Sequence, residues 1–289
     1  MKKIIAVLMA VAMLLCFAGC GSNGNDGSTA DKSKAGPKLK IINEELGAEE
    51  YGIAFRKGDD AVKDYIDAAV QELVKNGKYK EIADKYPDIV DNLLFLNGES
   101  KATFAGGVDI KKAEKRTFTM GIDPEYNPFS FMGDDGKYTG FDVEVCQAAC
   151  ELLGWEFKVF GVNWDQKLIQ LDAKECDCVW SGMTILDSMK SAGYVISAPY
   201  YYNTQVLVVK EDSGINSKDD LKDKLVAVQL GTSGESLLNE DLKDLKATFK
   251  ELVTCDSFLK CFTELESGTV DAVFVDYPVA KAYVEKQGK

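Results

Sequence analysis

A loop with glycine at both ends, Gly231-Thr232-Ser233-Gly234, lies between an apolar run over residues 225–228 and a helical segment over residues 235–242. Exposed backbone N–H groups at a helix start, together with the helix dipole, favour a carboxylate or a phosphate. The loop lacks the lysine of a phosphate-binding loop, which argues against nucleotide hydrolysis. Glycine-rich turns between a strand and a helix are also common for structural reasons, so the loop indicates either an anion site or a simple turn.

Two further polar groups come at the ends of predicted strands. Ser181-Gly182-Met183-Thr184 follows a strand predicted over residues 177–180, and ligands of open α/β sheets bind at the carboxyl ends of strands. Its exposed carbonyls and hydroxyl could hold an ammonium group or a carboxylate. Asp276 ends the apolar run over residues 270–275 and precedes Pro278. Its carboxylate either faces a cleft, where it can pair with a cationic ligand group, or caps the following helix.

Aromatic residues accompany these polar groups near predicted strand ends, namely Tyr126, Phe129, Phe131 and Trp164. Binding sites use aromatic walls with few polar anchors, although such residues also form ordinary core. The chain has no histidine, so it lacks the usual general base and the commonest metal ligand. We therefore expect no catalytic residue, no metal and no cofactor.

Helical and strand patterns alternate along the chain and predict an α/β fold with parallel strands covered by helices on both faces. The pattern restarts after a crossing strand at residues 205–209. About 250 residues follow the N-terminal segments, which favours two lobes over one large core. The predicted strands cover residues 39–42, 51–55, 118–122, 157–159, 177–180, 205–209, 225–228 and 270–275, and the main helices residues 60–76, 79–86, 141–152, 164–174, 235–242 and 277–286.

The N-terminus has the composition of an export signal. Lys2 and Lys3 precede an apolar run over residues 4–17, which is shorter than the ~20 residues that span a membrane. Ala18-Gly19-Cys20 resembles the cleavage site of bacterial lipoproteins, and residues 21–37 have the composition of a flexible tether. We predict a lipoprotein signal over residues 1–20, lipidation at Cys20 and anchoring at the outer face of the cell membrane. An ordinary cleaved signal is the alternative.

The formal net charge of −13 argues against a nucleic-acid partner, which would attract basic patches. Cys146 and Cys150 are four apart on a predicted helix, and Cys176 and Cys178 alternate on a predicted strand, so neither spacing favours a bridge within its own pair. A bridge from Cys150 to Cys176 or Cys178 stays open. Buried free thiols are the other interpretation.

Several short motifs follow one another in an order that resembles the solute-binding proteins of polar amino-acid ABC transporters. The resemblance covers nearly all of residues 38–95 and 117–289 and implies a two-lobed, type II periplasmic-binding-protein-like clamshell. The motifs are Met120-Gly121-Ile122-Asp123, Pro128-Phe129-Ser130-Phe131, Gly140-Phe141-Asp142-Val143, Ser181-Gly182-Met183-Thr184-Ile185, Ser197-Ala198-Pro199-Tyr200, Gly231-Thr232-Ser233-Gly234, Asp271-Ala272-Val273, Asp276-Tyr277-Pro278, Glu50-Tyr51-Gly52-Ile53-Ala54-Phe55-Arg56-Lys57-Gly58 and Asn76-Gly77-Lys78-Tyr79.

The resemblance implies a monomeric, non-enzymatic protein that captures an amino acid, or a related small polar amine, and presents it to the permease subunits of an ABC transporter. Two alternatives are a sensor whose closure signals to a partner protein and a small-acid dehydratase on the same fold. The dehydratase would need an acid or base in the cleft, for which Asp123, Asp276 and Lys190 are the evident candidates.

The resemblance also implies roles for individual residues. Tyr126 and Trp164 would sandwich the ligand side chain, and Asp276 would accept the α-ammonium group. The family's usual arginine, which forms a bidentate pair with the ligand carboxylate, is replaced here by Met189 or Lys190, and lysine cannot form the planar fork. The other implied contacts are Asp123 and Gln229 at the ligand side chain, with Ser181, Gly182, Thr184, Thr232 and Ser233 at the carboxylate.

The two motifs of the family's ending, in residues 50–58 and 76–79, stand near the front of this chain. This order indicates a circular permutation, in which residues 38–95 belong after Lys289 and residues 97–115 connect the family's usual termini. Lobe 1 would then comprise residues 50–203, and lobe 2 would combine residues 38–49 with residues 210–289. The hinge would lie near residues 49–52 and 203–206.

Overall fold

The computed structural model describes residues 36–96 and 108–287. The predicted signal with Cys20, the tether up to residue 35 and connector residues 97–107 lie outside the described residues. Within the described ranges, no helix has the length and apolarity needed to cross a membrane.

Three parallel strands, β12 (Glu251–Cys255), β11 (Leu225–Gln229) and β13 (Ala272–Asp276), lie next to one another in a group that we call the β11 sheet. Strand β10 (Tyr201–Lys210) runs antiparallel to β13, and β1 (Leu39–Ile42) runs antiparallel to β10. The short apolar run at the front of the chain therefore forms a strand beside residues more than 160 positions later, as its sequence predicted.

A second group, which we call the β3 sheet, contains the parallel strands β7 (Glu156–Gly161), β3 (Thr117–Ile122) and β8 (Cys178–Thr184). Strand β2 (Ala48–Phe55) runs antiparallel to β8, and the short β9 (Val195–Ile196) pairs with β2. Strand β8 is longer than predicted, so Ser181 to Thr184 lie inside the strand and not in a loop after it. The parallel strands confirm the α/β class expected from the sequence.

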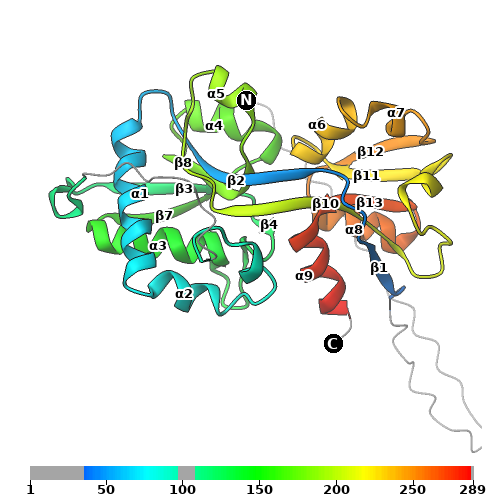
Figure 1. Ribbon diagram of the computed structural model, residues 1–289, viewed down its shortest axis with the longest axis horizontal. Helices are drawn as coiled ribbons and strands as arrows, with labels where there is room; N and C mark the ends of the chain where they lie inside the picture. Colours follow the sequence, from blue (N-terminus) through cyan, green and yellow to red (C-terminus); the bar gives the residue numbers. More distant parts are fainter. Residues whose placement is uncertain (1–35, 97–107, 288–289) are drawn as a thin grey trace, which may run out of the picture. The chain divides into compact units, whose positions relative to one another are not determined.

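Two long strands join these sheets (Figure 1). The first four residues of β10, Tyr201 to Thr204, pair with residues 48–51 of β2, and the two strands continue into different sheets. All strands of both groups thus belong to one hydrogen-bonded sheet, in the order β12-β11-β13-β10-β2-β8-β3-β7, with β1 attached to β10 and β9 attached to β2 beside this path. A ligand bound between the two halves would lie against these connecting strands.

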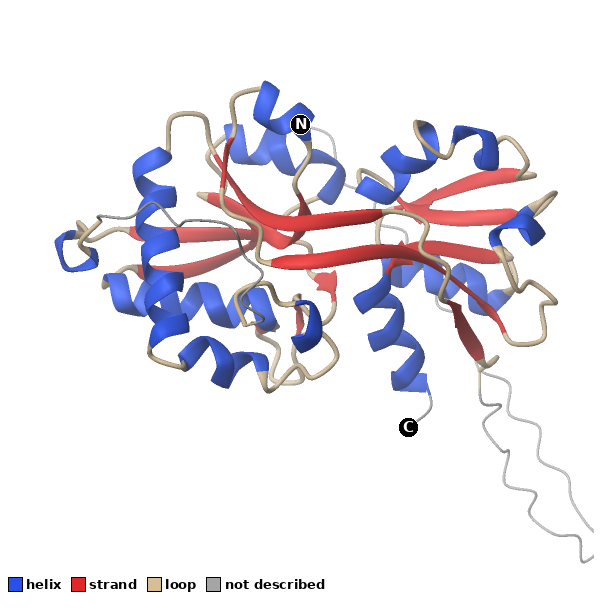
Figure 2. Cartoon of the chain, in the orientation of Figure 1, coloured by secondary structure: helices blue, strands red, loops and turns tan. Residues whose placement is uncertain are grey.

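Helices lie on both sides of the strands in each half (Figure 2). Helix α1 buries Ile66, Ala69, Val70 and Leu73, which is the face predicted from their spacing, and it packs against α3. Helix α9 contacts both β10 and β1. The helices of the β3 half are α1 (Asp60–Lys75), α2 (Lys78–Ala83), α3 (Phe141–Leu153), α4 (Lys167–Asp172) and α5 (Asp187–Ser191); those of the β11 half are α6 (Ser233–Asn239), α7 (Lys243–Lys246), α8 (Phe258–Ser267) and α9 (Tyr277–Gln287), with short 3₁₀ turns at Val90–Asn92, Ile110–Lys112, Trp164–Gln166 and Lys218–Leu221.

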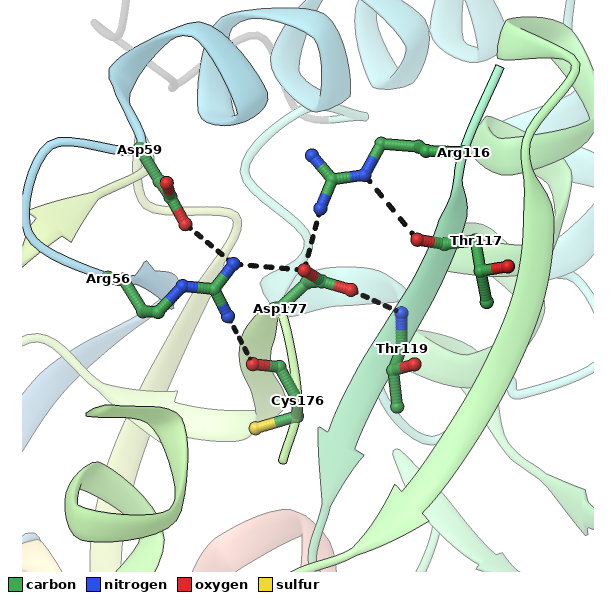
Figure 3. Close-up of polar contacts among 7 residues, drawn as sticks. All are labelled: Arg56, Asp59, Arg116, Thr117, Thr119, Cys176 and Asp177. Atoms are coloured by element: carbon green, nitrogen blue, oxygen red, sulfur yellow. Dashed lines mark hydrogen bonds and ion pairs between the residues drawn. The ribbon is translucent and has the colours of Figure 1, made fainter. Parts of the chain in front are cut away.

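An ionic cluster ties the front block of the chain to the β3 sheet (Figure 3). The Asp177 carboxylate binds the guanidinium groups of Arg56 at 2.9 Å and Arg116 at 2.6 Å, and it accepts the backbone N–H of Thr119 at 2.8 Å. Arg56 also donates to the carbonyl of Cys176 at 2.5 Å. Arg56 follows β2 directly, so this cluster fixes the end of that strand against β3 and β8.

A small antiparallel sheet contains β4 (Glu125–Tyr126), β5 (Ser130–Met132) and β6 (Tyr138–Thr139), with a turn of glycine and aspartate residues at 133–136 between β5 and β6. The cysteines of the described part of the chain are free and buried, which agrees with the buried-thiol interpretation. Cys150 forms no bridge to Cys176 or Cys178.

Candidate functional site

A cavity of about 30 Å³ lies between the ends of the β3-sheet strands and the loops of the β11 half. Seven of the residues singled out from the sequence line it. They are Tyr126, Trp164, Gly182, Thr184, Thr232, Ser233 and Asp276. Gly231, Met183 and Met189, which also line it, belong to motifs or positions noted in the sequence, whereas no sequence pattern singled out Lys167 or Leu186.

Direct contacts between the two halves enclose this cavity. The Thr184 hydroxyl donates to Ser233 Oγ at 3.0 Å, and the Gln229 amide donates to the Asp123 carboxylate at 2.7 Å. A volume of this size is comparable to the space of a single water molecule. The described conformation is therefore closed, and an amino acid could enter only if these contacts separate.

Asp276, the last residue of β13, has the most extensive polar environment in the cavity wall. Its Oδ1 accepts hydrogen bonds from the Tyr51 hydroxyl at 2.9 Å, the Asn203 amide at 2.6 Å and the Gln205 amide at 2.7 Å. The same two amides also donate to Glu49 Oε1, at 2.5 and 2.9 Å. Burial, and then the nearby charge of Glu49, raise the pKa of Asp276 well above its ordinary value. A cationic ligand group would compensate the buried Asp276 carboxyl group and the half-buried Glu49 beside it.

The supporting residues of Asp276 were not found in the sequence because they come from other strands. Glu49 and Tyr51 lie on β2, and Asn203 and Gln205 lie on β10. One carboxyl group of β13 thus bonds to both strands that join the sheets. Only the pairing of β2 with β10 brings these side chains together, and this pairing cannot be predicted from the spacing of residues along the sequence.

Aromatic side chains form one wall of the cavity. The Tyr126 hydroxyl lies 2.7 Å from that of Tyr51, and the Tyr126 ring lies 6.0 Å from the ring of Phe258 in the β11 half. Trp164 is buried, and the Lys167 ammonium lies 4.7 Å from the centre of its indole ring. Tyr126 and Trp164 therefore share one cavity, as their predicted roles require.

The backbone of Gly182 is held from behind by a buried carboxyl group. Asp142 Oδ2 accepts the Gly182 N–H at 2.8 Å and the Tyr200 hydroxyl at 2.6 Å. Burial raises the pKa of Asp142 to about 7. Gly182 has a left-handed backbone with φ of +53°, and a Cβ there would lie 2.2 Å from a Tyr126 ring carbon. Only glycine permits this approach of the strand to the aromatic wall.

Three residues predicted to contact the ligand lie behind the cavity wall. Ser181 is fully buried, and its hydroxyl accepts the Asp123 N–H at 3.1 Å and lies 2.5 Å from the Ser130 hydroxyl. Asp123 is buried beside Gln229, and burial raises the pKa of its carboxyl group. In the closed form these three residues bond to one another, through Asp123 N–H to Ser181 and the Gln229 amide to Asp123.

The Thr232 hydroxyl has local partners. It donates to the Gln229 carbonyl at 2.7 Å and accepts the Glu235 N–H at 3.2 Å, so Thr232 is the N-cap of α6. Helix α6 begins at Ser233, two residues earlier than predicted.

Of the two residues expected at the arginine position, the structure brings Met189 and not Lys190 to the cavity. Lys190 is exposed on α5 and lies 3.4 Å from the Asp187 carboxylate, so its charge is directed to the surface. The cation that does line the cavity is Lys167, the first residue of α4. Its N–H groups donate to the carbonyls of Gly231 at 2.7 Å and Trp164 at 3.1 Å.

The model of the bacterial extracellular solute-binding proteins, family 3, matches residues 118–253. The L-cystine-binding protein TcyJ of Escherichia coli is 38% identical over 197 residues, which cover 67% of this chain and 72% of that protein. The chain belongs to this family. Other relatives are the ABC transporter arginine-binding protein 1 of Escherichia coli, 28% identical over 60% of this chain and 68% of that protein, and the arginine-binding extracellular protein ArtP of Bacillus subtilis, 32% identical over 58% and 64%. The family is described as extracellular.

Solved structures agree with the fold. The chain resembles an ABC uptake transporter substrate-binding protein from Streptococcus pneumoniae with bound histidine, with a TM-score of 0.57 and 29% identity over 60% of this chain and 70% of that one. It also resembles the ancestral amino acid-binding protein AncCDT-1, a precursor of cyclohexadienyl dehydratase, with a TM-score of 0.52 and 34% identity over 58% and 74% of the two chains. The type II periplasmic-binding-protein fold inferred from the sequence is confirmed.

Proposed function

We propose that this protein captures a single amino acid, or a related small polar amine, in the cavity at Asp276 and delivers it to an ABC permease. The observation that carries the proposal is the buried Asp276 carboxyl group, which lines a cavity with aromatic walls and shares its two amide donors with the half-buried Glu49. An α-ammonium group would neutralise these carboxyl groups, while Tyr126 and Trp164 would enclose the ligand side chain. Membership of a family of amino-acid-binding proteins supports the same ligand class.

In this proposal the protein binds its ligand and does not convert it chemically. A ligand-binding panel tests this, with L-cystine, L-histidine, the other common amino acids and simple amines added to the purified full chain. A ligand that binds only the folded state raises the melting temperature with its concentration. Asp276→Asn should abolish the shift, while Asp187→Asn, on the exposed helix α5, should retain it. A panel without any shift, an unchanged shift in Asp276→Asn, or consumption of the ligand would contradict the proposal.

We further propose that lobe 1 comprises residues 50–203 and lobe 2 residues 38–49 with 210–289, joined by a hinge near residues 49–52 and 203–206. The pairing of β2 with β10 at these positions supports this division. The closed contacts between the halves support a ligand-driven closure, in which the remaining site residues Asp123, Ser181, Gly182, Thr184, Gln229, Thr232 and Ser233 would face the ligand after rearrangement.

The chain order of this fold is proposed to be a circular permutation. In its support, helix α9 near residue 287 contacts strand β1 at residues 39–42, although the two are far apart in the sequence. Moving residues 38–95 behind Lys289 should give a folded protein with unchanged ligand affinity. Loss of binding in the folded, reordered chain would contradict a neutral rearrangement.

We also propose that the protein is a monomer anchored by a lipid at Cys20. Labelling of cells with a radioactive fatty acid should mark the wild-type protein and not Cys20→Ser, and light scattering of the purified chain should give the mass of one copy. A labelled Cys20→Ser protein would remove the anchor from that residue.

A further inference from the structure

Lys167 contributes a positive charge to a cavity whose other ionised or ionisable wall groups are acidic or phenolic. Its ammonium lies against the Trp164 ring and donates to the carbonyls of Trp164 and Gly231. An ammonium group carries three N–H donors, and these two carbonyls use two of them. One donor remains for a group inside the cavity.

The described part of the chain provides Lys167 with no carboxylate at ion-pair distance. Burial lowers the pKa of its ammonium to about 8, and the more distant charges of Asp165, Asp123 and Glu235 act in the opposite direction. Lys167 is half-buried, and a cation withdrawn from water is costly unless an anion compensates it. A ligand that places an anionic group here would supply that compensation.

No other described residue that lines this cavity carries a positive charge that could bind a carboxylate. Met183, Leu186 and Met189 are apolar, and Lys190 points to the surface. Asp276 is the acidic group of the same cavity. The cavity therefore combines one cationic and one acidic side chain.

We propose that Lys167 binds a carboxylate of the ligand while Asp276 binds its ammonium group, so that the site selects zwitterionic amino acids over simple amines. This proposal rests on the proposed function, because it assumes that the ligand enters this cavity. The bond from Lys167 to Gly231 joins the two halves directly, since Gly231 lies in the loop before α6. The same ammonium thus contacts the ligand and the opposite half when the protein closes.

Two pairs of probes test the role of Lys167, because the members of each pair differ only in their carboxylates. They are L-cystine with cystamine and L-histidine with histamine, titrated calorimetrically into the purified full chain. The wild-type protein should bind one of the amino acids roughly 10- to 100-fold more tightly than its amine, as expected for a charge-assisted hydrogen bond. Lys167→Met should lose this preference by weakening amino-acid binding while the amine affinity stays within about twofold of wild type.

Lys190→Met is the matched control, because it replaces an exposed lysine in the same half of the protein. This variant should bind the amino acid and its amine with wild-type affinities. Lys167→Gln, which keeps a donor for the Gly231 carbonyl, should lose the preference as well. If both Lys167 variants retain wild-type affinity and preference, the inference is wrong and the proposed function stands. If the wild-type protein binds none of the four probes and no other amino acid, the proposed function itself fails.

Discussion

Gly231 offers the sharpest test of closure, because the space for its missing side chain is occupied by the other half of the protein. Its φ is +74°, and a Cβ there would lie 2.6 Å from Asp165 Cα and 3.1 Å from Asp165 N. Asp165 belongs to the turn before α4 in the β3 half. Gly231→Ala should therefore hinder the closed form more than the open one.

The magnitude follows from these contacts. Carbon atoms in contact lie about 3.5–4.0 Å apart, so the loop must retreat by roughly 1 Å. That movement stretches the bond from Lys167 to the Gly231 carbonyl, now 2.7 Å, and the bond between Thr184 and Ser233, now 3.0 Å. Weakening one charged and one neutral hydrogen bond costs about 1–3 kcal/mol, or roughly a 10- to 100-fold loss of ligand affinity.

The strain of a left-handed alanine, about 1–2 kcal/mol, is present in the open and closed forms alike and should lower stability without changing affinity. Gly214→Ala controls for it, because Gly214 has φ of +76° in the same half and no atom within 4 Å of its added Cβ. Calorimetry gives the affinity of both variants, and urea unfolding gives their stability. Equal ligand affinity in Gly231→Ala and Gly214→Ala would refute the proposed closure at this loop.

Three further changes have expected outcomes. Gly182→Ala should displace the Tyr126 ring and cost about 1–3 kcal/mol of stability beyond the strain in Gly154→Ala, whose Cβ meets nothing within 4 Å; equal urea midpoints for the two variants would contradict this. Asp177→Asn should lower the unfolding free energy by about 1–3 kcal/mol through its two arginine partners and leave ligand affinity unchanged, so a wild-type urea midpoint would contradict the role of that cluster. Asp142 has a folded-state pKa of about 7, above its unfolded value, so the folded state binds the extra proton and stability falls as pH rises from about 4 to about 7. Asp142→Asn should flatten that part of the melting-temperature profile, and an unchanged slope would exclude Asp142 as its source.

The predicted elements were most accurate where local spacing decides the structure. The face of α1 and the strand at Leu39–Ile42 follow from short apolar patterns, and both are present. Strand β8 was predicted too short because Ser181 and Gly182 have the composition of a loop. In the structure β8 pairs with β2 on both sides of them, at Cys178–Val179 and at Met183–Thr184, with a bulge in between. Neighbouring strands, and not the residues themselves, determine how far the strand extends.

The sequence predicted the aromatic and strand-end residues of the site better than it predicted the charged residues around them. Tyr126, Trp164 and Asp276 were found because strand ends and aromatic residues are visible in a sequence. Lys167 was missed since a lysine at the start of a helix usually faces solvent, and only the approach of the Gly231 loop encloses it. Glu49 was missed for a similar reason, because its partners lie on another strand.

Asp276, where we propose that the ligand binds, is hydrogen-bonded to residues of β10, one of the two strands that join the halves. Asn203 and Gln205 on β10 donate to both Asp276 and Glu49, so the amides that stabilise these carboxyl groups belong to the strand that we propose as part of the hinge. A cation arriving at Asp276 changes the hydrogen-bonding demand on those amides. If the proposed hinge and ligand site are correct, the charge of the ligand acts directly on the hinge strand, and substitutions at Asn203 should alter how readily the protein opens without contacting the ligand.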